Sequence, residues 1–162
     1  MSLRGWTIET PLAPWSVVVD GDVVVASGFC SLEQLGERLP GGAETLSRAD
    51  ATGVVAAAAR AYLAGDAGAL DAVAVRQPGG EFQQQAWSVM REIPAGLTWS
   101  YADIATKAGR PSATRAAGAA CARNLVAPFV PCHRVVRSDG SLGGYAYGLP
   151  VKRWLLALEQ QR

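Results

Sequence analysis

The sequence predicts an α+β protein of two domains, residues 1–77 and 78–162. A length of 162 residues, 49% of them hydrophobic and 18% charged, suits one ordinary globular domain or two small ones. Runs of β-branched residues dominate the start of the chain, whereas apolar residues at helical spacing dominate its second half. The boundary is placed at Gln77-Pro78-Gly79-Gly80, because Pro and Gly interrupt helices and strands.

The first half is expected to combine a β-hairpin with short helices. Trp15–Val19 and Val23–Ser27 are β-branched runs on either side of Asp20-Gly21-Asp22, whose residues tolerate the positive φ of a tight turn. The other predicted elements are a short helix over Ser31–Leu39, an Ala-rich helix over Leu46–Ala64 with Gly65 as its cap, and a strand over Ala72–Val75. No pattern in this half points to chemistry.

The second half is expected to be mostly helical. Apolar residues keep helical spacing from Phe82 to Ile93, and Ser100 with Asp103 forms a capping box that starts another helix. The helix that starts at this capping box and the next helix, over Ala113–Arg123, together predict a helix-turn-helix. That helix is rich in Ala and Gly, so its backbone could approach a partner closely. A tightly packed internal helix would have the same composition, and both interpretations stay open.

Charge is distributed unevenly between the halves. Residues 1–77 carry five Arg and Lys against nine acidic residues, a net charge of −4, whereas residues 78–162 carry ten against five, a net charge of +5. A basic second half indicates that this half meets a polyanion, although chance would also produce such a difference.

Cysteine and histidine usage narrows the class of protein. Three cysteines cannot all pair, and no basic-then-apolar leader opens the chain, so we expect a reducing, cytoplasmic location. The longest apolar stretch, Val54–Ala59, is too short to cross a membrane. One histidine and three scattered cysteines give no pair at metal-ligand spacing, so we expect no metal.

One segment, Pro131-Cys132-His133-Arg134-Val135-Val136, carries residues suited to nucleophilic chemistry. A thiol is a weak nucleophile until it ionises, and His133, the chain's single histidine, is its candidate base. Side chains of adjacent residues diverge on extended backbone, so contact would need a local turn or a bridging water. Glu159, at the end of a helix that Pro150 opens, is the candidate carboxylate behind the histidine.

Each of these three residues has an ordinary alternative. Cys132 could be an inert buried cysteine, His133 a hydrogen-bonded core histidine, and Glu159 a solvated residue at a helix end.

The same segment resembles the active-site signature of the methylated-DNA–protein-cysteine methyltransferases. Supporting matches follow in family order, so that the resemblance covers residues 80–160: Phe82-Gln83-Gln84-Gln85-Ala86-Trp87, Ser100-Tyr101, Arg115-Ala116-Ala117-Gly118, Asn124, Gly144-Tyr145 and Lys152-Arg153-Trp154-Leu155. The resemblance implies a ribonuclease-H-like N-terminal domain and a winged-helix-like C-terminal domain.

The resemblance also implies a chemistry. Cys132 would accept the alkyl group of 6-O-alkylguanine or 4-O-methylthymine, once per molecule, without a cofactor. His133 would take the thiol proton through a water, polarised by Glu159. Asn124 would link the helix-turn-helix to the active-site segment, and Tyr101 would donate a proton to the departing guanine.

The implied partner is double-stranded DNA carrying alkylated bases, bound by a monomer with no membrane. Members of this family place the second helix in the minor groove and rotate the target nucleotide out of the stack. The implied DNA- and base-contacting residues are Tyr101, Arg115, Val135, Ser138, Tyr145 and Ala146.

Two departures from the family pattern have structural consequences. Leu125 and Ala127 stand where prolines are usual, so the chain between Asn124 and Pro131 is expected to follow a different path. Tyr147 stands where glycine is common, which predicts a narrower pocket that favours methyl over bulky adducts.

Three other interpretations compete with this one. A thiol hydrolase would use the same residue types but would turn over and need an oxyanion hole. A damage-recognition module would bind an extruded base without an acceptor cysteine, and the presence of Cys132 counts against it. A transcriptional helix-turn-helix would need side chains that contact base edges, and the small residues of the second helix offer few.

Overall fold

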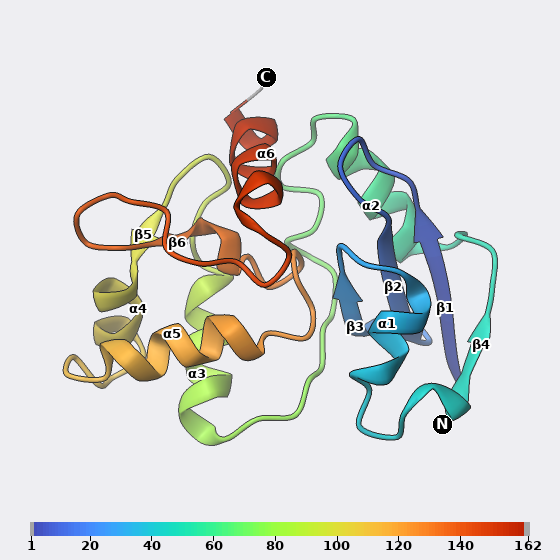
Figure 1. Ribbon diagram of the computed structural model, residues 1–162, viewed down its shortest axis with the longest axis horizontal. Coiled ribbons are helices and arrows are strands. Elements are labelled where there is room, and N and C mark those ends of the chain that lie inside the picture. Colours follow the sequence, from blue (N-terminus) through green and yellow to red (C-terminus); the bar gives the residue numbers. More distant parts are fainter. Residues whose placement is uncertain (1, 161–162) are drawn as a thin grey trace. The chain divides into compact units, whose positions relative to one another are not determined.

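A computed structural model describes residues 2–160 (Figure 1). It is a mixed α+β protein, as predicted, and its contacts divide it into two compact units. The first unit holds the residues up to Gln77 together with Leu125–Phe129, and the second holds Pro78–Asn124 together with the residues from Val130 onward. No helix within the described part of the chain is long and apolar enough to span a membrane.

The first unit is built on a four-stranded sheet with the order β3-β2-β1-β4. Its strands are β1 (Leu3–Ile8), β2 (Trp15–Asp20), β3 (Val23–Gly28) and β4 (Leu46–Arg48). β2 pairs antiparallel with both β1 and β3, and β4 pairs parallel with β1. The predicted hairpin is confirmed, and Gly21 adopts a φ of +62° in its turn.

Three helical elements complete this unit: α1 (Leu32–Glu37), the 3₁₀ turn η1 (Ala43–Thr45) and α2 (Val54–Leu63). The short helix predicted over Ser31–Leu39 is confirmed, and Ser31 caps it together with Gln34 in a capping box. The helix predicted over Leu46–Ala64 is wrong in its first part, because Leu46 instead pairs with Leu3. The strand predicted over Ala72–Val75 is reduced to a single bridge between Val75 and Val24.

The second unit is mainly helical. Its elements are α3 (Glu81–Met90), β5 (Trp99–Ser100), α4 (Tyr101–Lys107), α5 (Thr114–Arg123), the 3₁₀ turn η2 (Cys132–Arg134), β6 (Val135–Val136) and α6 (Leu149–Gln160). Ser100 and Asp103 form the predicted capping box of α4, and Gly109 follows that helix with a φ of +90°. The Trp87 indole donates 2.9 Å to the Ala120 carbonyl, which fastens α3 to α5.

The segment Leu125–Phe129 leaves α5 and packs within the first unit. The Leu125 N–H donates to Oε1 of Gln77 at 2.7 Å, and its carbonyl accepts from the Ser27 N–H at 2.8 Å. The Phe129 ring lies 5.8 Å from that of Trp15, a fully buried core residue of β2. This is the stretch in which Leu125 and Ala127 replace the expected prolines, and the Ala127–Pro128 peptide is cis.

Candidate active site

The thiol of Cys132 lies on the 3₁₀ turn η2, directly after Pro131. The sequence predicts that contact between the adjacent Cys132 and His133 side chains needs either a local turn or a bridging water. The structure has such a turn at this position. Cys132 is 6% exposed. The side-chain amide of Asn124, the residue that caps the C-terminus of α5, donates 2.8 Å to the Val130 carbonyl and 3.3 Å to Sγ of Cys132. Asn124 therefore joins the end of α5 to the thiol.

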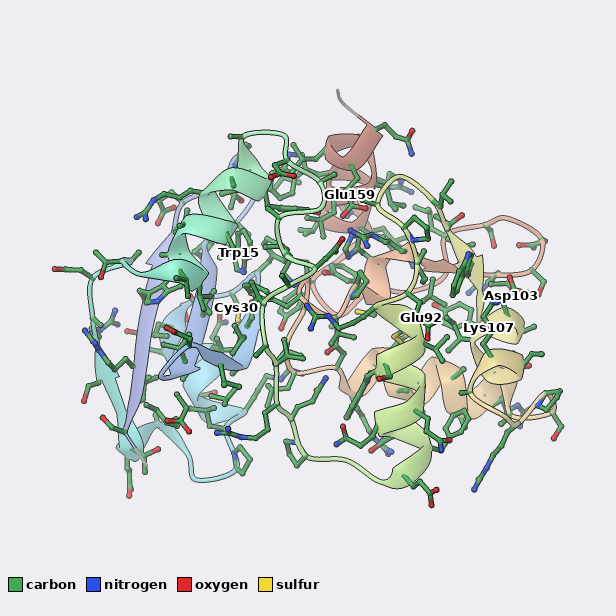
Figure 2. All side chains as sticks on the ribbon, turned by 180° about the vertical axis from the view of Figure 1, so that it is seen from behind. Trp15, Cys30, Glu92, Asp103, Lys107 and Glu159 are labelled. Carbon is green, nitrogen blue, oxygen red and sulfur yellow. The ribbon has the colours of Figure 1, made fainter. Side chains whose placement is uncertain are left out.

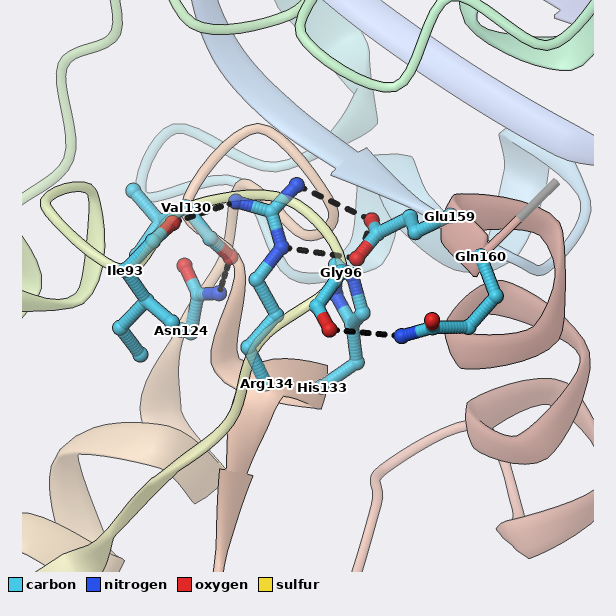
Figure 3. Close-up of polar contacts among 8 residues, drawn as sticks. All are labelled: Ile93, Gly96, Asn124, Val130, His133, Arg134, Glu159 and Gln160. Atoms are coloured by element: carbon cyan, nitrogen blue, oxygen red, sulfur yellow. Dashed lines mark hydrogen bonds and ion pairs between the residues drawn. The ribbon is translucent and has the colours of Figure 1, made fainter. Parts of the chain in front are cut away.

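His133 and Glu159 form a buried pair (Figure 3). Nε2 of His133 lies 2.7 Å from Oε2 of Glu159, and both side chains are fully shielded from solvent. Glu159 is therefore not a solvated helix-end residue. At the adjoining position of α6, Gln160 donates 2.6 Å to the Gly96 carbonyl and fixes the end of the helix.

Arg134 is a third member of this buried cluster, and sequence reasoning missed it. Its Nε donates 2.8 Å to Oε1 of Glu159, and its Nη2 donates 3.0 Å to Oε2. Its Nη1 donates 2.8 Å to the Ile93 carbonyl, so the guanidinium is held on two sides (Figure 3). A bidentate guanidinium–carboxylate pair is strong and directional. Arg134 therefore fixes the carboxylate that contacts His133.

The charges of this cluster follow from its contacts. Burial alone would raise the pKa of Glu159, but the hydrogen bonds from His133 and Arg134 outweigh it and hold the pKa at about 2. Burial lowers the pKa of His133, although Glu159 opposes this effect. At neutral pH Glu159 is ionised, so Nε2 of a neutral His133 donates to it and Nδ1 is left as the acceptor. Nδ1 is buried and has no hydrogen-bond partner among the described residues. Such a nitrogen is suited to accept a proton.

A pocket of about 460 Å³ opens beside the thiol. Its lining residues come from α4, α5, η2 and the loop that precedes α6: Tyr101, Gly118, Cys121, Ala122, Cys132, Gly144, Tyr145 and Ala146. The volume is within the range of pockets that enclose a small molecule or a single base. Sequence reasoning did not assign Cys121 or Gly118 to the site, because only the fold brings α5 to the thiol.

Lys152 holds the loop over this pocket in place, and it too was missed. The residue is fully buried on α6, and its Nζ donates to the carbonyls of Val135 at 2.8 Å, Leu142 at 2.5 Å and Gly144 at 3.2 Å. Two of these carbonyls belong to the loop and one to β6. A buried ammonium must satisfy its donors, so the loop backbone is drawn onto α6.

Tyr101 is enclosed between that loop and α5. Gly143 has a φ of +73°, and a Cβ at this position would meet Oη of Tyr101 at 2.7 Å, so the loop approaches the phenol only because this residue is glycine. Burial and the nearby thiols Cys121 and Cys132 raise the pKa of Tyr101 to about 12. The phenol therefore stays protonated at neutral pH and can act as a donor.

The remaining predicted contact residues lie in different environments. Arg115 and Ser138 are exposed, whereas Val135 is fully buried in β6, and its carbonyl accepts from Lys152. Tyr147 packs edge-on against Tyr145 at 5.7 Å. Among the described residues, those that line the pocket include Tyr145 but not Tyr147.

Together these features define a thiol-dependent α+β protein. Cys121 and Cys132 line a small pocket, a buried His–Glu pair lies beside Cys132, and Asn124 joins the end of α5 to the Cys132 thiol. Comparison with known proteins narrows the class. Residues 81–161 match the family model described as the 6-O-methylguanine DNA methyltransferase DNA-binding domain. The chain belongs to the methylated-DNA–protein-cysteine methyltransferase family.

Individual relatives agree with this assignment. The methylated-DNA–protein-cysteine methyltransferase of Methanosarcina acetivorans is 48% identical over 99 residues, which are 61% of this chain and 63% of that protein. The Escherichia coli bifunctional transcriptional activator and DNA repair enzyme Ada is 49% identical over 83 residues, which are 51% of this chain and 23% of Ada. The alignments therefore span less than two thirds of the length of these curated relatives.

Solved structures extend the likeness to both units. The Mycobacterium tuberculosis protein OGT, crystallised in complex with DNA, is 33% identical, with a TM-score of 0.82 over 97% of this chain and 93% of that one. An O6-methylguanine-DNA methyltransferase from Pyrococcus kodakaraensis shares the fold, with a TM-score of 0.71 at 21% identity, over 97% of this chain and 98% of that one.

Proposed function

We propose that this protein repairs DNA by direct reversal, moving the alkyl group of 6-O-alkylguanine, and of 4-O-methylthymine, onto Cys132. The observation that carries the proposal is the placement of this thiol at the wall of a 460 Å³ pocket, next to a histidine whose free nitrogen can accept a proton. The Cys132–His133–Glu159 set supplies the nucleophile, the base and the charge behind the base.

The transfer is a displacement at carbon. The Cys132 thiol proton passes through a water to Nδ1 of His133, and Glu159 stabilises the resulting imidazolium. The thiolate sulfur attacks the alkyl carbon in line with its bond to oxygen, so that a C–S bond forms as the C–O bond breaks. The departing base takes a proton from Tyr101, which its raised pKa of about 12 keeps available. The thioether is stable, and each molecule therefore acts once.

The reaction requires an extruded nucleotide, because a stacked base cannot align its alkyl carbon with a recessed sulfur. In this proposal the helix-turn-helix of α4 and α5, in a winged-helix-like arrangement, binds the duplex and extrudes the target nucleotide. Ala116 and Ala122 are exposed on α5, so its backbone can approach the floor of the minor groove, and the exposed Arg115 is placed to fill the vacated space. The OGT relative described as bound to DNA supports DNA as the partner.

The remaining parts of the proposal concern the state of the protein. We expect a cytoplasmic monomer that needs neither a metal nor a cofactor. Its first half, with a ribonuclease-H-like arrangement, is expected to carry no part of the chemistry.

The test is a stoichiometric transfer assay. Duplex DNA containing 6-O-methylguanine with a tritiated methyl group is incubated with the protein, and the label is located by peptide mapping. We expect one methyl group per molecule, all of it on Cys132, and none transferred by Cys132→Ser. Cys30→Ser, which alters a thiol of the first unit (Figure 2), is the matched control and should retain transfer.

Two other outcomes would overturn the proposal. Repeated turnover would identify a thiol hydrolase. Binding of the alkylated duplex without any label on the protein would identify a recognition module instead.

A further inference from the structure

Two of the three cysteines line the same pocket. Cys132 lies on η2 and Cys121 on the last turn of α5, and both contribute to the wall of the 460 Å³ cavity. The third cysteine, Cys30, belongs to the first unit. These three described cysteines form no disulfide in the structure. The proposed transfer uses Cys132 alone, which leaves Cys121 without a role.

A single residue ties the backbones that carry the two thiols. The Asn124 N–H donates to the Cys121 carbonyl at 3.3 Å, while the Asn124 side chain donates to Sγ of Cys132 at 3.3 Å and to the Val130 carbonyl at 2.8 Å. The end of α5 and the turn η2 are therefore held together, and the two cysteines stay on one cavity wall. A small oxidant that enters this cavity meets both cysteines in its wall.

We propose that Cys121 is the resolving thiol for Cys132, so that the pair forms a reversible intramolecular disulfide when the protein meets a hydroperoxide. In the first step the Cys132 thiolate attacks the peroxide oxygen, the O–O bond breaks, and Cys132 sulfenic acid and hydroxide form; the hydroxide takes up a proton to give water. In the second step the Cys121 sulfur displaces the sulfenic oxygen, which leaves as water, and the S–S bond forms. Two thiols are oxidised and one hydroperoxide is reduced.

The electrostatics of the pocket suit this order of events. Burial raises the pKa of Cys121, the negative charge of Cys132 raises it further, and Lys152 lowers it. While Cys132 is a thiolate, Cys121 therefore stays protonated and does not compete as a nucleophile. A sulfenic acid is neutral, so the repulsion from Cys132 disappears at the step at which Cys121 must ionise. Lys152, which remains, then favours the Cys121 thiolate.

The disulfide has two consequences for the protein. It removes the alkyl acceptor reversibly, and it prevents further oxidation of Cys132 to sulfinic acid, which thiol reductants do not reverse. A dithiol reductant restores both thiols.

The experiment follows sulfur chemistry directly and does not depend on the alkyl-transfer activity. The reduced full-length protein is treated with hydrogen peroxide, free thiols are counted with a maleimide, and disulfides are mapped in unreduced peptides by mass spectrometry. We expect wild type to lose two maleimide-reactive thiols and two hydrogen atoms of mass, with Cys121 and Cys132 in one crosslinked peptide pair. Dithiothreitol should restore all three thiols.

Variants separate the roles of the cysteines. Cys30→Ser should form the same crosslink, whereas Cys121→Ser should form none and should gain two or three oxygen atoms on Cys132. Wild type that accumulates sulfinic acid on Cys132 without the crosslink, or that crosslinks through Cys30, would overturn the inference. The wild-type arm decides this even if Cys121→Ser fails to fold.

Discussion

At the scale of single residues, the site depends on charges that are buried yet fully paired. Sequence reasoning found Cys132, His133 and Glu159, because a thiol, an imidazole and a carboxylate form a recognisable chemical set. It missed Arg134 and Lys152, since a cation in a sequence is ordinarily expected at the surface. Their roles depend on acceptors far away in the sequence, such as Glu159 for Arg134 and the Leu142 carbonyl for Lys152, which only the fold supplies.

Glu159→Gln is the sharpest test of the buried cluster. It keeps the shape of the side chain but removes the charge that stabilises a protonated His133, so the single-turnover rate of methyl transfer should fall roughly 10²-fold. Loss of the ion pair with the buried Arg134 should also lower the free energy of unfolding by about 3 kcal/mol. Rates come from quenched-flow transfer assays, and stability comes from urea unfolding.

Glu92→Gln is the matched control for that substitution. Glu92 is exposed just after α3 (Figure 2). Glu92→Gln should therefore change the transfer rate and the free energy of unfolding far less than Glu159→Gln does. Equal effects of the two substitutions would contradict a special role for Glu159.

The same cluster predicts how stability depends on pH. The pKa of His133 is lowered from 6.5 and that of Glu159 from 4.5 to about 2, so in both pH windows the unfolded chain binds more protons than the folded one. The free energy of unfolding should therefore fall as the pH drops below about 6.5, and fall again between about 4.5 and 2. Urea unfolding at a series of pH values across this range measures the free energy of unfolding. In Glu159→Gln the free energy of unfolding should depend less on pH between about 4.5 and 2. An unchanged slope in that range would count against assigning it to Glu159.

At the scale of elements, the sequence predicted what local chemistry decides. The Asp20-Gly21-Asp22 turn and the Ser100–Asp103 capping box involve residues three or fewer apart, and both are confirmed. The helix expected over Leu46–Ala64 is confirmed only in its later part, as α2, because Leu46 pairs instead with Leu3, more than forty residues away. Helical propensity is a weak preference that such a pairing overrides.

Two glycines of the loop before α6 allow a matched test of its packing. Gly140 and Gly143 both have positive φ, so alanine at either position should cost about 1–2 kcal/mol in strain. An alanine Cβ at position 140 meets nothing within 4 Å, whereas at position 143 it meets the Tyr101 hydroxyl at 2.7 Å. We expect Gly143→Ala alone to slow methyl transfer, by at least 10-fold, because it displaces the phenol that lines the pocket. Similar transfer rates for the two variants would show that Tyr101 tolerates the shift.

At the scale of the whole molecule, the uneven charge predicts how DNA binding responds to salt. Binding of phosphates by the basic second half releases counterions, so affinity for duplex DNA should fall steeply between about 50 and 200 mM salt. Arg115→Gln should reduce the slope of log affinity against log salt by about 1. Arg4→Gln, an exposed change on β1 in the acidic half, should leave the slope unaltered. Fluorescence anisotropy with a labelled duplex measures both, and equal slopes would refute the assignment of Arg115 to the interface.

The path of Leu125–Phe129 bears on how such a chain could be divided or recombined. These five residues belong to the core of the first unit, although both their neighbours, Asn124 and Val130, belong to the second and are joined by a hydrogen bond of 2.8 Å. A fragment that begins at Pro78 would thus carry an apolar strip without its natural cover, and one that ends at Gln77 would lack part of its interior. The two halves are interlaced rather than consecutive modules, so fusion, truncation or gene shuffling at residue 78 would damage both at once.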